Sequence, residues 1–268
     1  MEIPPAGDSG FLNKVFNLKN LTIIENNLIP AIHSDVFAEK YFALRQQEGR
    51  VYTDEEVSTL PFIHQTHRYY KEWVVRKHSY RALLSYIRQK DFSNILEVGC
   101  GNGWLAAHLA IDTGSEVTGL DINSIELEQA KRVFFSIPRL NFIEGSLDSG
   151  CLRDKKFDLI IFPGSLHYFP SVEQTIHIAL EYLTLLGEVH IMDSPFYEQH
   201  EIEAAKQRAK KYFNFLGFTD MAGYFYYHTI SELDVFQYKI LNHPLSWKNK
   251  LSFTKHPFYW ITIKNRYR

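Results

Sequence analysis

The chain has 268 residues, of which 45% are hydrophobic and 22% are charged, and its formal net charge is −2. It has two cysteines, no basic-then-apolar start, and no apolar run of the roughly 18–20 residues that a membrane span needs. These features argue against a disulfide framework, a paired metal-ligand motif, a membrane protein and a secreted protein. The composition favours a cytoplasmic globular protein without a metal site.

The first ninety residues lack the strand–helix alternation of the rest of the chain. Apolar residues at helical spacing predict a helix from Ser34 to Gln47 and a longer one from about Thr66 to Gln89. A polar segment with a Leu60-Pro61 break separates them. We interpret residues 1–90 as a helical cap, whose density of polar and aromatic groups suits a pocket wall. These groups include Glu48, Arg50, Tyr52, His64, His67, Tyr70, Glu72 and Trp73.

From Ser93 onward, short apolar runs alternate with helical patterns. The predicted strands are 94–98, 116–120, 140–144, 157–162, 188–192, 235–241 and 258–264. The predicted helices are 102–111, 124–135, 171–183 and 201–216. The alternation predicts an α/β domain over residues 91–268, with a doubly wound, mostly parallel seven-stranded sheet and right-handed crossovers.

The first strand of this domain leads into a glycine-rich turn. Residues 95–103 read Ile95-Leu96-Glu97-Val98-Gly99-Cys100-Gly101-Asn102-Gly103, and a helical pattern follows at once. Such a turn lets the backbone approach a ligand closely and directs the helix amides at it. Eighteen residues after Gly103, Asp121 ends the second strand, where a carboxylate can accept hydrogen bonds from both hydroxyls of a ribose. The glycine-rich turn and Asp121 together predict an adenosine-containing cofactor.

The residue at position 104 decides between cofactors. A dinucleotide fingerprint, Gly-x-Gly-x-x-Gly, needs a third glycine where this chain has Trp104. Gly-x-Gly-x-Gly preceded by Glu97 instead resembles motif I of the class I S-adenosylmethionine-dependent methyltransferases. The resemblance implies S-adenosyl-L-methionine as the cofactor and a Rossmann-like fold whose last strand is antiparallel and lies beside the fifth. It also implies that the N-terminal cap forms a substrate lid.

The resemblance assigns cofactor contacts to the strand ends. Glu97 would help orient the methionine portion, Asp121 would bind the ribose and Ile122 would lie against adenine. Where the family often has an aspartate that binds the adenine amino group, this chain has Ser146, so Ser146, the Leu147 backbone or Asp148 would make that contact. The expected cofactor-binding residues are Glu97, Gly99, Cys100, Gly101, Asn102, Gly103, Asp121, Ile122, Ser146, Leu147, Pro163 and Gly164.

Two further strand ends supply candidate catalytic residues. After the fourth strand, Ser165-Leu166-His167-Tyr168-Phe169 is similar to a family segment that often reads Leu-His-His-Phe. His167 and Tyr168 are therefore expected to point toward the substrate. The fifth strand ends in Asp193-Ser194-Pro195-Phe196-Tyr197, which resembles a group of bacterial methyltransferases without an assigned substrate. Asp193 and Tyr197 are second-rank pocket candidates. An alcohol or phenol acceptor would need His167, His64 or His67 as a base, whereas an amine would need only a carbonyl or carboxylate to steer it.

The predicted activity is methyl transfer to an oxygen or nitrogen atom of a small-molecule acceptor. One alternative is a methyltransferase for tRNA or another nucleic acid, because residues 201–268 carry 11 Lys/Arg against 5 Asp/Glu. That region also offers aromatic side chains, including Tyr212, Phe213, Trp247 and Phe253. A second alternative is a non-catalytic protein that binds S-adenosylmethionine. No membrane association is expected.

Overall fold

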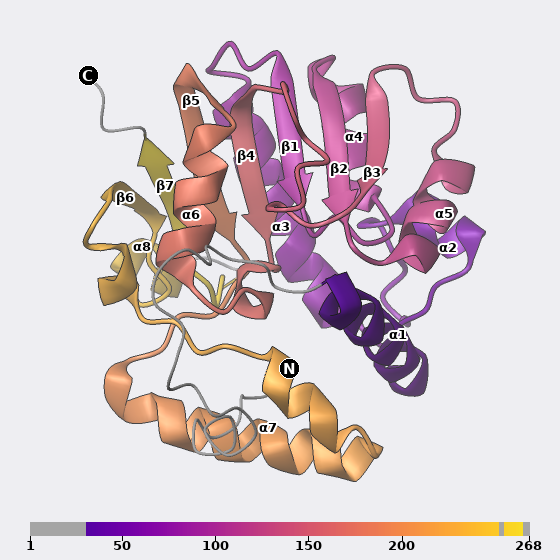
Figure 1. Cartoon of the computed structure of the whole chain (residues 1–268), viewed down its shortest axis with the longest axis vertical. Coiled ribbons are helices and arrows are strands. Elements are labelled where there is room, and N and C mark those ends of the chain that lie inside the picture. The colour runs from indigo at the N-terminus through magenta and orange to yellow at the C-terminus, as the bar shows by residue number, and fades with distance from the viewer. Residues whose placement is uncertain (1–30, 252–254, 265–268) are drawn as a thin grey trace, which may run out of the picture.

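The structure is a computed structural model, which describes residues 31–251 and 255–264. Its centre is a seven-stranded sheet in the order β3-β2-β1-β4-β5-β7-β6 (Figure 1). The strands are β1 Asn94–Val98, β2 Glu116–Asp121, β3 Leu140–Glu144, β4 Phe157–Pro163, β5 Leu183–Met192, β6 Gln237–Asn242 and β7 Trp260–Lys264. The predicted fold class is confirmed.

The pairing of the strands brings several strand ends to one edge. Strands β3, β2, β1, β4 and β5 are parallel neighbours, whereas β7 pairs antiparallel with β5, with Val189 opposite Ile263. The antiparallel last strand beside β5 is therefore also confirmed. Since parallel strands end at the same edge, the residues after β1, β2, β4 and β5 lie together there.

The α-helices are α1 Ala31–Glu48, α2 Asp54–Thr59, α3 Tyr70–Ile87, α4 Trp104–Thr113, α5 Ser124–Val133, α6 Val172–Glu181, α7 Ile202–Leu216 and α8 Trp247–Leu251. Helix α6 lies in front of the sheet in Figure 1, and α3 lies behind it. The short helix α2 was not predicted. It begins with a capping box in which Thr53 and Glu56 each bond the other's backbone N–H.

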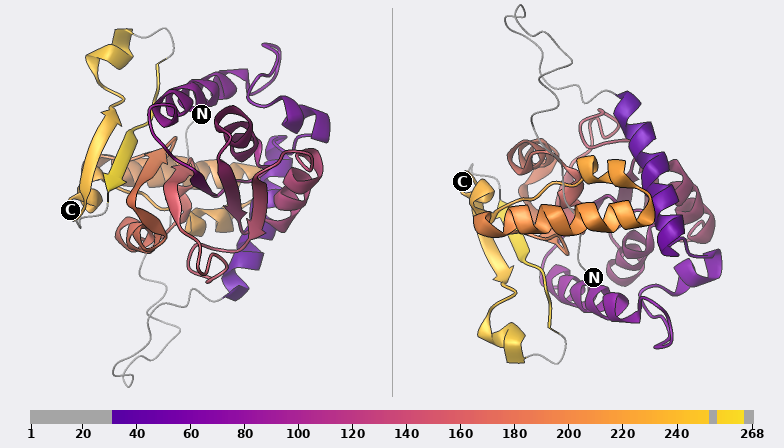
Figure 2. Two further views of the ribbon diagram at one scale, coloured as in Figure 1. Left: turned by 90° about the horizontal axis from the view of Figure 1, so that it is seen from above. Right: turned by 90° about the horizontal axis from the view of Figure 1, so that it is seen from below.

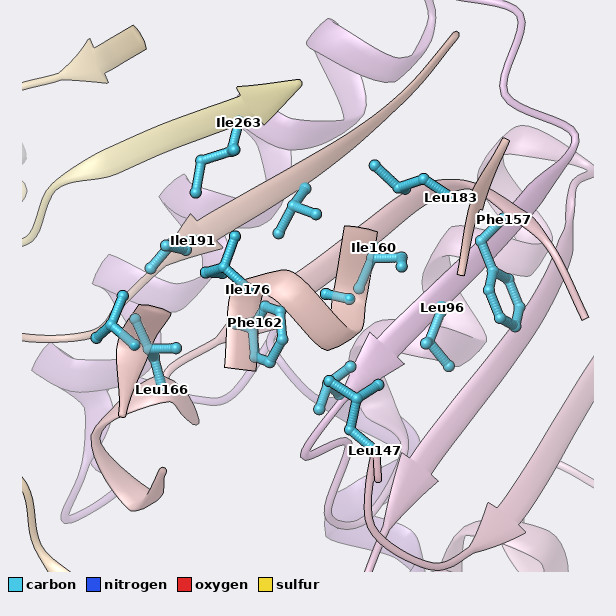
Figure 3. Close-up of a cluster of buried hydrophobic side chains, with 14 of the residues drawn as sticks. Leu96, Leu147, Phe157, Ile160, Phe162, Leu166, Ile176, Leu183, Ile191 and Ile263 are labelled. Carbon is cyan, nitrogen blue, oxygen red and sulfur yellow. The ribbon is translucent and has the colours of Figure 1, made fainter. Parts of the chain in front are cut away.

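The strand side chains fill a core on each face of the sheet. Leu96, Ile160 and Phe162 are fully buried on the α6 side, where they share a cluster with Ile176 (Figure 3). Their neighbours along the strands, such as Ile95 and Ile161, lie on the opposite face among side chains of α3 and α4. Burial of one such side chain contributes about 1.5–3 kcal/mol, so the near-continuous apolar runs fix these strands inside the sheet.

A third cluster holds a lobe beyond the carboxyl edge of the sheet. Leu44 of α1 and Phe213 of α7 pack with Met221 of the 3₁₀ segment Thr219–Tyr224 and with Phe225. Seen from below, α7 and α1 lie in front of the sheet (Figure 2, right). We call α1, α7 and residues 219–225 the cap lobe.

The cap lobe differs from the N-terminal cap expected over residues 1–90. It takes α7 from the C-terminal part of the chain, whereas α3 packs on the sheet through Leu83, Leu84 and Ile87. The reason lies in the buried face of α7, whose Ala209 and Phe213 pack with Leu44 and Met221 rather than on a strand. Residues 1–30 of the expected cap lie outside the described residues.

Candidate active site

The glycine turn connects β1 with α4 and needs left-handed backbone at three positions. Gly99, Gly101 and Gly103 have φ values of 77°, 51° and 74°. A Cβ on Gly99 would lie 2.5 Å from the Cβ of Ser165, whose hydroxyl donates to the Val98 carbonyl at 2.5 Å. The turn after β1 therefore lies directly against the segment after β4.

Gly103 has a packing role rather than a place at the ligand side of the turn. A Cβ there would lie 2.5 Å from the Phe142 ring and 2.9 Å from Ala130, between β3 and α5. We expect Gly103→Ala to lower the free energy of unfolding by several kcal/mol, because left-handed strain of about 1–2 kcal/mol adds to the overlap. Gly114→Ala is the matched control, since Gly114 has φ 72° but no atom near its Cβ position. Equal losses in a denaturant titration of both variants would contradict this assignment.

Three carboxyl groups surround the turn. Asp121 accepts hydrogen bonds from the Gly101 N–H at 2.7 Å and the Asn123 N–H at 2.8 Å. Glu97 is 2% exposed, and its Oε2 has no partner among the described residues. Burial raises the pKa of Glu97 well above its usual value, despite a hydrogen bond from the Ala106 N–H. A buried acid with an unused oxygen beside a glycine turn suits a ligand that carries its own donors, as an ammonium group does.

Glu126 of α5 is the third carboxyl, and sequence analysis did not find it. Its carboxyl lies within 3.5–3.7 Å of the position that a Cβ on Gly101 would take. Burial and the charge of Asp121 raise the pKa of Glu126 to about 7, and Arg45 opposes the shift. The signal was present in the sequence, since Glu126 stands five residues after Asp121, in the first turn of the following helix.

A single cavity of about 1310 Å³ extends from this turn to the cap lobe. Most of the expected cofactor residues line it, and so do Tyr168 and Asp193, whereas Gly103 and His167 do not. The expected residues on its wall are Glu97, Gly99, Cys100, Gly101, Asn102, Asp121, Ile122, Ser146, Leu147, Pro163 and Gly164. Of the polar and aromatic groups expected to form a pocket wall, Arg50, Tyr52, Glu72 and Trp73 line the cavity.

His167 does not reach the cavity wall. It lies in the 3₁₀ segment Leu166–Tyr168, and its ring contacts Tyr168 and Phe225 with centroids 4.3 and 4.8 Å away. Burial and the charge of Arg45 lower the pKa of His167 to about 3, so it is a weak proton acceptor. His167 is thus buried and is not part of the cavity wall, whereas the next residue in the same turn, Tyr168, lines the cavity.

Tyr168 belongs to an aromatic wall on the cap side of the cavity. Its ring is perpendicular to that of Tyr41, with centroids 5.6 Å apart, and tilted against Phe37 at 5.5 Å. Tyr224 adds a contact to Phe37 at 5.1 Å. The Arg45 guanidinium lies 4.8 Å from the centre of the Tyr41 ring. Phe37, Tyr41 and Tyr224 come from the cap lobe. The position of the cap lobe over the sheet edge could not be predicted from local sequence.

Asp193 follows β5 and carries its carboxylate into a buried polar cluster. Its Oδ1 accepts from the Ser79 hydroxyl at 2.6 Å and lies 3.1 Å from Nε2 of His256. His256 Nδ1 lies 3.1 Å from the Phe258 carbonyl. Burial opposes protonation of His256, but the Asp193 carboxylate raises its pKa above 6.5. With a φ of 52°, Asp193 is one of few non-glycine residues in the left-handed region, a strain often found at functional sites.

Two of the three aromatic residues of α7, Tyr212 and Phe213, make contacts within the protein, whereas Phe215 is exposed. Phe213 is buried in the cap lobe, and the Tyr212 hydroxyl donates to Glu48. Lys206 is paired with Glu203 at 2.7 Å. Phe253 lies outside the described residues.

The described helices include none that is long and apolar enough to cross a membrane, and within residues 31–251 and 255–264 no cluster of His, Cys, Asp and Glu could hold a metal ion.

Residues 95–186 match the family model of a methyltransferase domain. The chain is 36% identical over 80 residues to a fatty-acid O-methyltransferase of Mycolicibacterium smegmatis, an alignment covering 30% of this chain and 29% of that protein. It is also 36% identical over 78 residues to a release factor glutamine methyltransferase of Fusobacterium nucleatum, covering 28% and 22%. The chain thus spans less than a third of the length of these curated relatives.

Solved structures resemble most of the fold at low sequence identity. The plantazolicin methyltransferase BpumL in complex with SAH superposes with a TM-score of 0.52 at 16% identity, covering 88% of this chain and 98% of that one. The YcgJ protein of Bacillus subtilis superposes with a TM-score of 0.52 at 14% identity, covering 71% and 99%. At these identities the likeness shows the fold.

Proposed function

Because the chain contains a class I S-adenosylmethionine-dependent methyltransferase domain, we propose that it methylates an oxygen or nitrogen atom of a small-molecule acceptor. S-adenosylmethionine is the cofactor of this domain. The observation that carries the proposal is the single cavity, which joins the glycine turn and Asp121 to the aromatic wall of the cap lobe. Cofactor and acceptor would meet inside it.

The residues at the sheet edge suit this cofactor. Asp121 would accept from the ribose hydroxyls, and Glu97 offers an unused buried oxygen near the glycine turn. Ile122, Ser146 and Leu147, which line the same part of the cavity, would hold the adenine. When bound, S-adenosylmethionine supplies an electrophilic methyl group, whose bond to sulfur breaks as the acceptor lone pair attacks from the opposite side.

The chain then has to orient the acceptor, exclude water and take up a proton. Correct orientation can supply about 7–11 kcal/mol of the barrier. The cap lobe and the aromatic wall would exclude water. For a hydroxyl acceptor, Asp193 lies on the cavity wall to receive the proton, and Nε2 of His256 lies 3.1 Å behind it to hold that proton. We propose His256 rather than His167 as the group that holds the proton. Of the two histidines, only His256 contacts a carboxylate on the cavity wall.

The experiment is to incubate the purified chain with S-adenosylmethionine and measure S-adenosylhomocysteine formation after adding fractions of a cell extract. We expect turnover with the low-molecular-weight fraction. Turnover only with the RNA fraction would favour the nucleic-acid alternative, and its salt dependence would then be steep because phosphate contacts release counterions. Tight cofactor binding with no turnover in any fraction would favour a non-catalytic binding protein.

A pH-dependence of cofactor binding is expected from Glu126. Its pKa of about 7 is that of the chain without a bound cation, and a nearby sulfonium favours the ionised form. Affinity for S-adenosylmethionine should therefore rise as the pH rises through about 7, with proton release on binding at lower pH. S-adenosylhomocysteine, which lacks the sulfonium charge, should show a smaller change.

Calorimetry in two buffers of different ionisation enthalpy measures this proton release directly. Glu126→Gln should remove most of it while the glycine turn stays intact. Glu128→Gln is the matched control, since Glu128 lies on the same helix but is exposed and paired with Lys131. An unchanged proton release in Glu126→Gln would rule out this role.

A further inference from the structure

Five charged side chains form an alternating row on the cap side of the cavity. Arg45 and Arg50 both contact Glu48, at 3.1 and 3.3 Å. Arg50 also donates a bidentate pair of hydrogen bonds to the Glu72 carboxylate, at 3.1 and 2.7 Å. Arg76 donates to the same carboxylate at 3.2 Å. Three guanidinium groups thus share two carboxylates, and both ends of the row are arginines.

The row faces the cavity, and its members differ in burial. Glu48 and Arg50 are buried, whereas the side chains of Arg45, Glu72 and Arg76 are 23%, 22% and 28% exposed. Arg45, Arg50, Glu72 and Arg76 line the cavity, whereas Glu48 does not and instead accepts a hydrogen bond from Tyr212. Despite burial, the pKa of Glu72 is lowered to about 2 by Arg76 and Arg50, so Glu72 is fully ionised near neutral pH. Guanidinium groups stay protonated, so these five side chains carry one surplus positive charge. Glu126, which interacts with Arg45, offsets that charge only when it is ionised, and its pKa is about 7. An anion that enters the cavity at the row would therefore meet a favourable charge.

The two ends of the row lie in different parts of the cavity. The Arg76 end reaches the sheet edge, where its NH1 lies 3.9 Å from the position that a Cβ on Gly164 would take. The Arg45 end lies against the aromatic wall, over the Tyr41 ring. Arg45 donates from one nitrogen to Glu48 and also hydrogen-bonds Tyr41, and its guanidinium group has further N–H donors at the cavity wall. The Arg45 end is thus the part of the row that meets the acceptor.

We propose that the acceptor is a carboxylic acid with an aromatic or apolar body, anchored by Arg45. The carboxylate would complete the charge of the row, and the body would pack on Phe37, Tyr41 and Tyr168. A monoanion matches a single surplus charge better than a phosphate dianion does. Lys40, the other cation on this wall, is paired with Asp220 at 2.8 Å. This inference rests on the proposed methyltransferase function and specifies its substrate class.

The test measures ligand binding by calorimetry to the full chain saturated with S-adenosylhomocysteine. The probes are phenylpropionate, dodecanoate, the matching neutral amides and phenyl phosphate. We expect each acid to bind more tightly than its amide, and phenylpropionate to bind more tightly than phenyl phosphate. Arg45→Gln should weaken binding of the acids about ten- to hundredfold, as expected for loss of a charge-assisted hydrogen bond, and should leave binding of the amides unchanged.

Arg132→Gln is the matched control, because Arg132 of α5 is also ion-paired but is exposed and does not line the cavity. Glu48→Gln adds a further surplus charge and should tighten binding of the acids, an effect that loss of structure would not produce. Equal affinity for acids and amides, or equal loss in Arg45→Gln and Arg132→Gln, would overturn the inference. Tighter phenyl phosphate binding would replace the carboxylic acid with a phosphate. Failure of the wild-type chain to bind S-adenosylhomocysteine would instead refute the proposed function itself.

Discussion

Asp121→Ala is expected to lower the affinity for S-adenosylhomocysteine at least about tenfold, because each charge-assisted hydrogen bond to a ribose hydroxyl contributes roughly 1.5–3 kcal/mol. The structure adds a second cause. Asp121 accepts from the Gly101 and Asn123 amides, so its removal also releases the glycine turn that would hold the methionine portion. Titration calorimetry measures the affinity.

Two variants separate these causes from a general loss of structure. Asp121→Asn keeps one acceptor oxygen for the turn but loses the charge, so its affinity should lie between those of the wild type and Asp121→Ala. Glu116→Ala, at the exposed opposite end of the same strand, should bind normally. An Asp121→Ala variant with unchanged affinity and an unchanged melting temperature would exclude Asp121 from the cofactor site.

For a hydroxyl acceptor, Asp193→Asn should lower kcat by about 10²–10⁴-fold while cofactor affinity stays within a few-fold. Asparagine also tolerates left-handed backbone, so the variant keeps the turn after β5. Ser79→Ala removes a hydrogen bond to the same carboxylate but leaves it on the cavity wall, and it should cost far less. Asp193→Asn with a wild-type kcat on an identified hydroxyl acceptor would refute the role.

The pH profile provides an independent measurement of this cluster. His256 can hold the proton only when it is neutral, and its pKa lies above 6.5, so kcat should rise with pH through a value above 6.5. His78, whose ring centroid lies 6.0 Å from that of His256, has a pKa lowered by burial and by His256, so it is already neutral in that range. His256→Gln should remove the rise. The same rise in His256→Gln would assign it to another group.

Much of the sheet and of the cofactor end could be predicted from the sequence because both depend on short stretches. Apolar runs define β1 to β5, and parallel strands that end at one edge bring the glycine turn and Asp121 together. The same topology places the residues that follow β3, β4 and β5 on the cavity wall. Trp104 excluded a dinucleotide fingerprint at the level of sequence. In the structure its ring packs against Trp73 and Tyr80 in the core behind the sheet.

The acceptor end could not be predicted because it depends on contacts between distant segments. Arg45 comes from α1, its aromatic neighbour Tyr168 follows β4, and the lobe that positions both needs α7. His256 reaches Asp193 only because the chain returns to the sheet before β7. The direction of His167 depended on a single 3₁₀ turn, which no periodicity in the sequence indicates.

We propose that one cavity holds the cofactor at the sheet edge and the acceptor under the cap lobe. A crystal structure of the chain with S-adenosylhomocysteine tests it most directly. We expect the ribose hydroxyls within hydrogen-bonding distance of Asp121, and the sulfur atom facing the part of the cavity bounded by Tyr168 and Asp193. S-adenosylhomocysteine bound outside this cavity, or with its sulfur turned away from the cap lobe, would refute this arrangement.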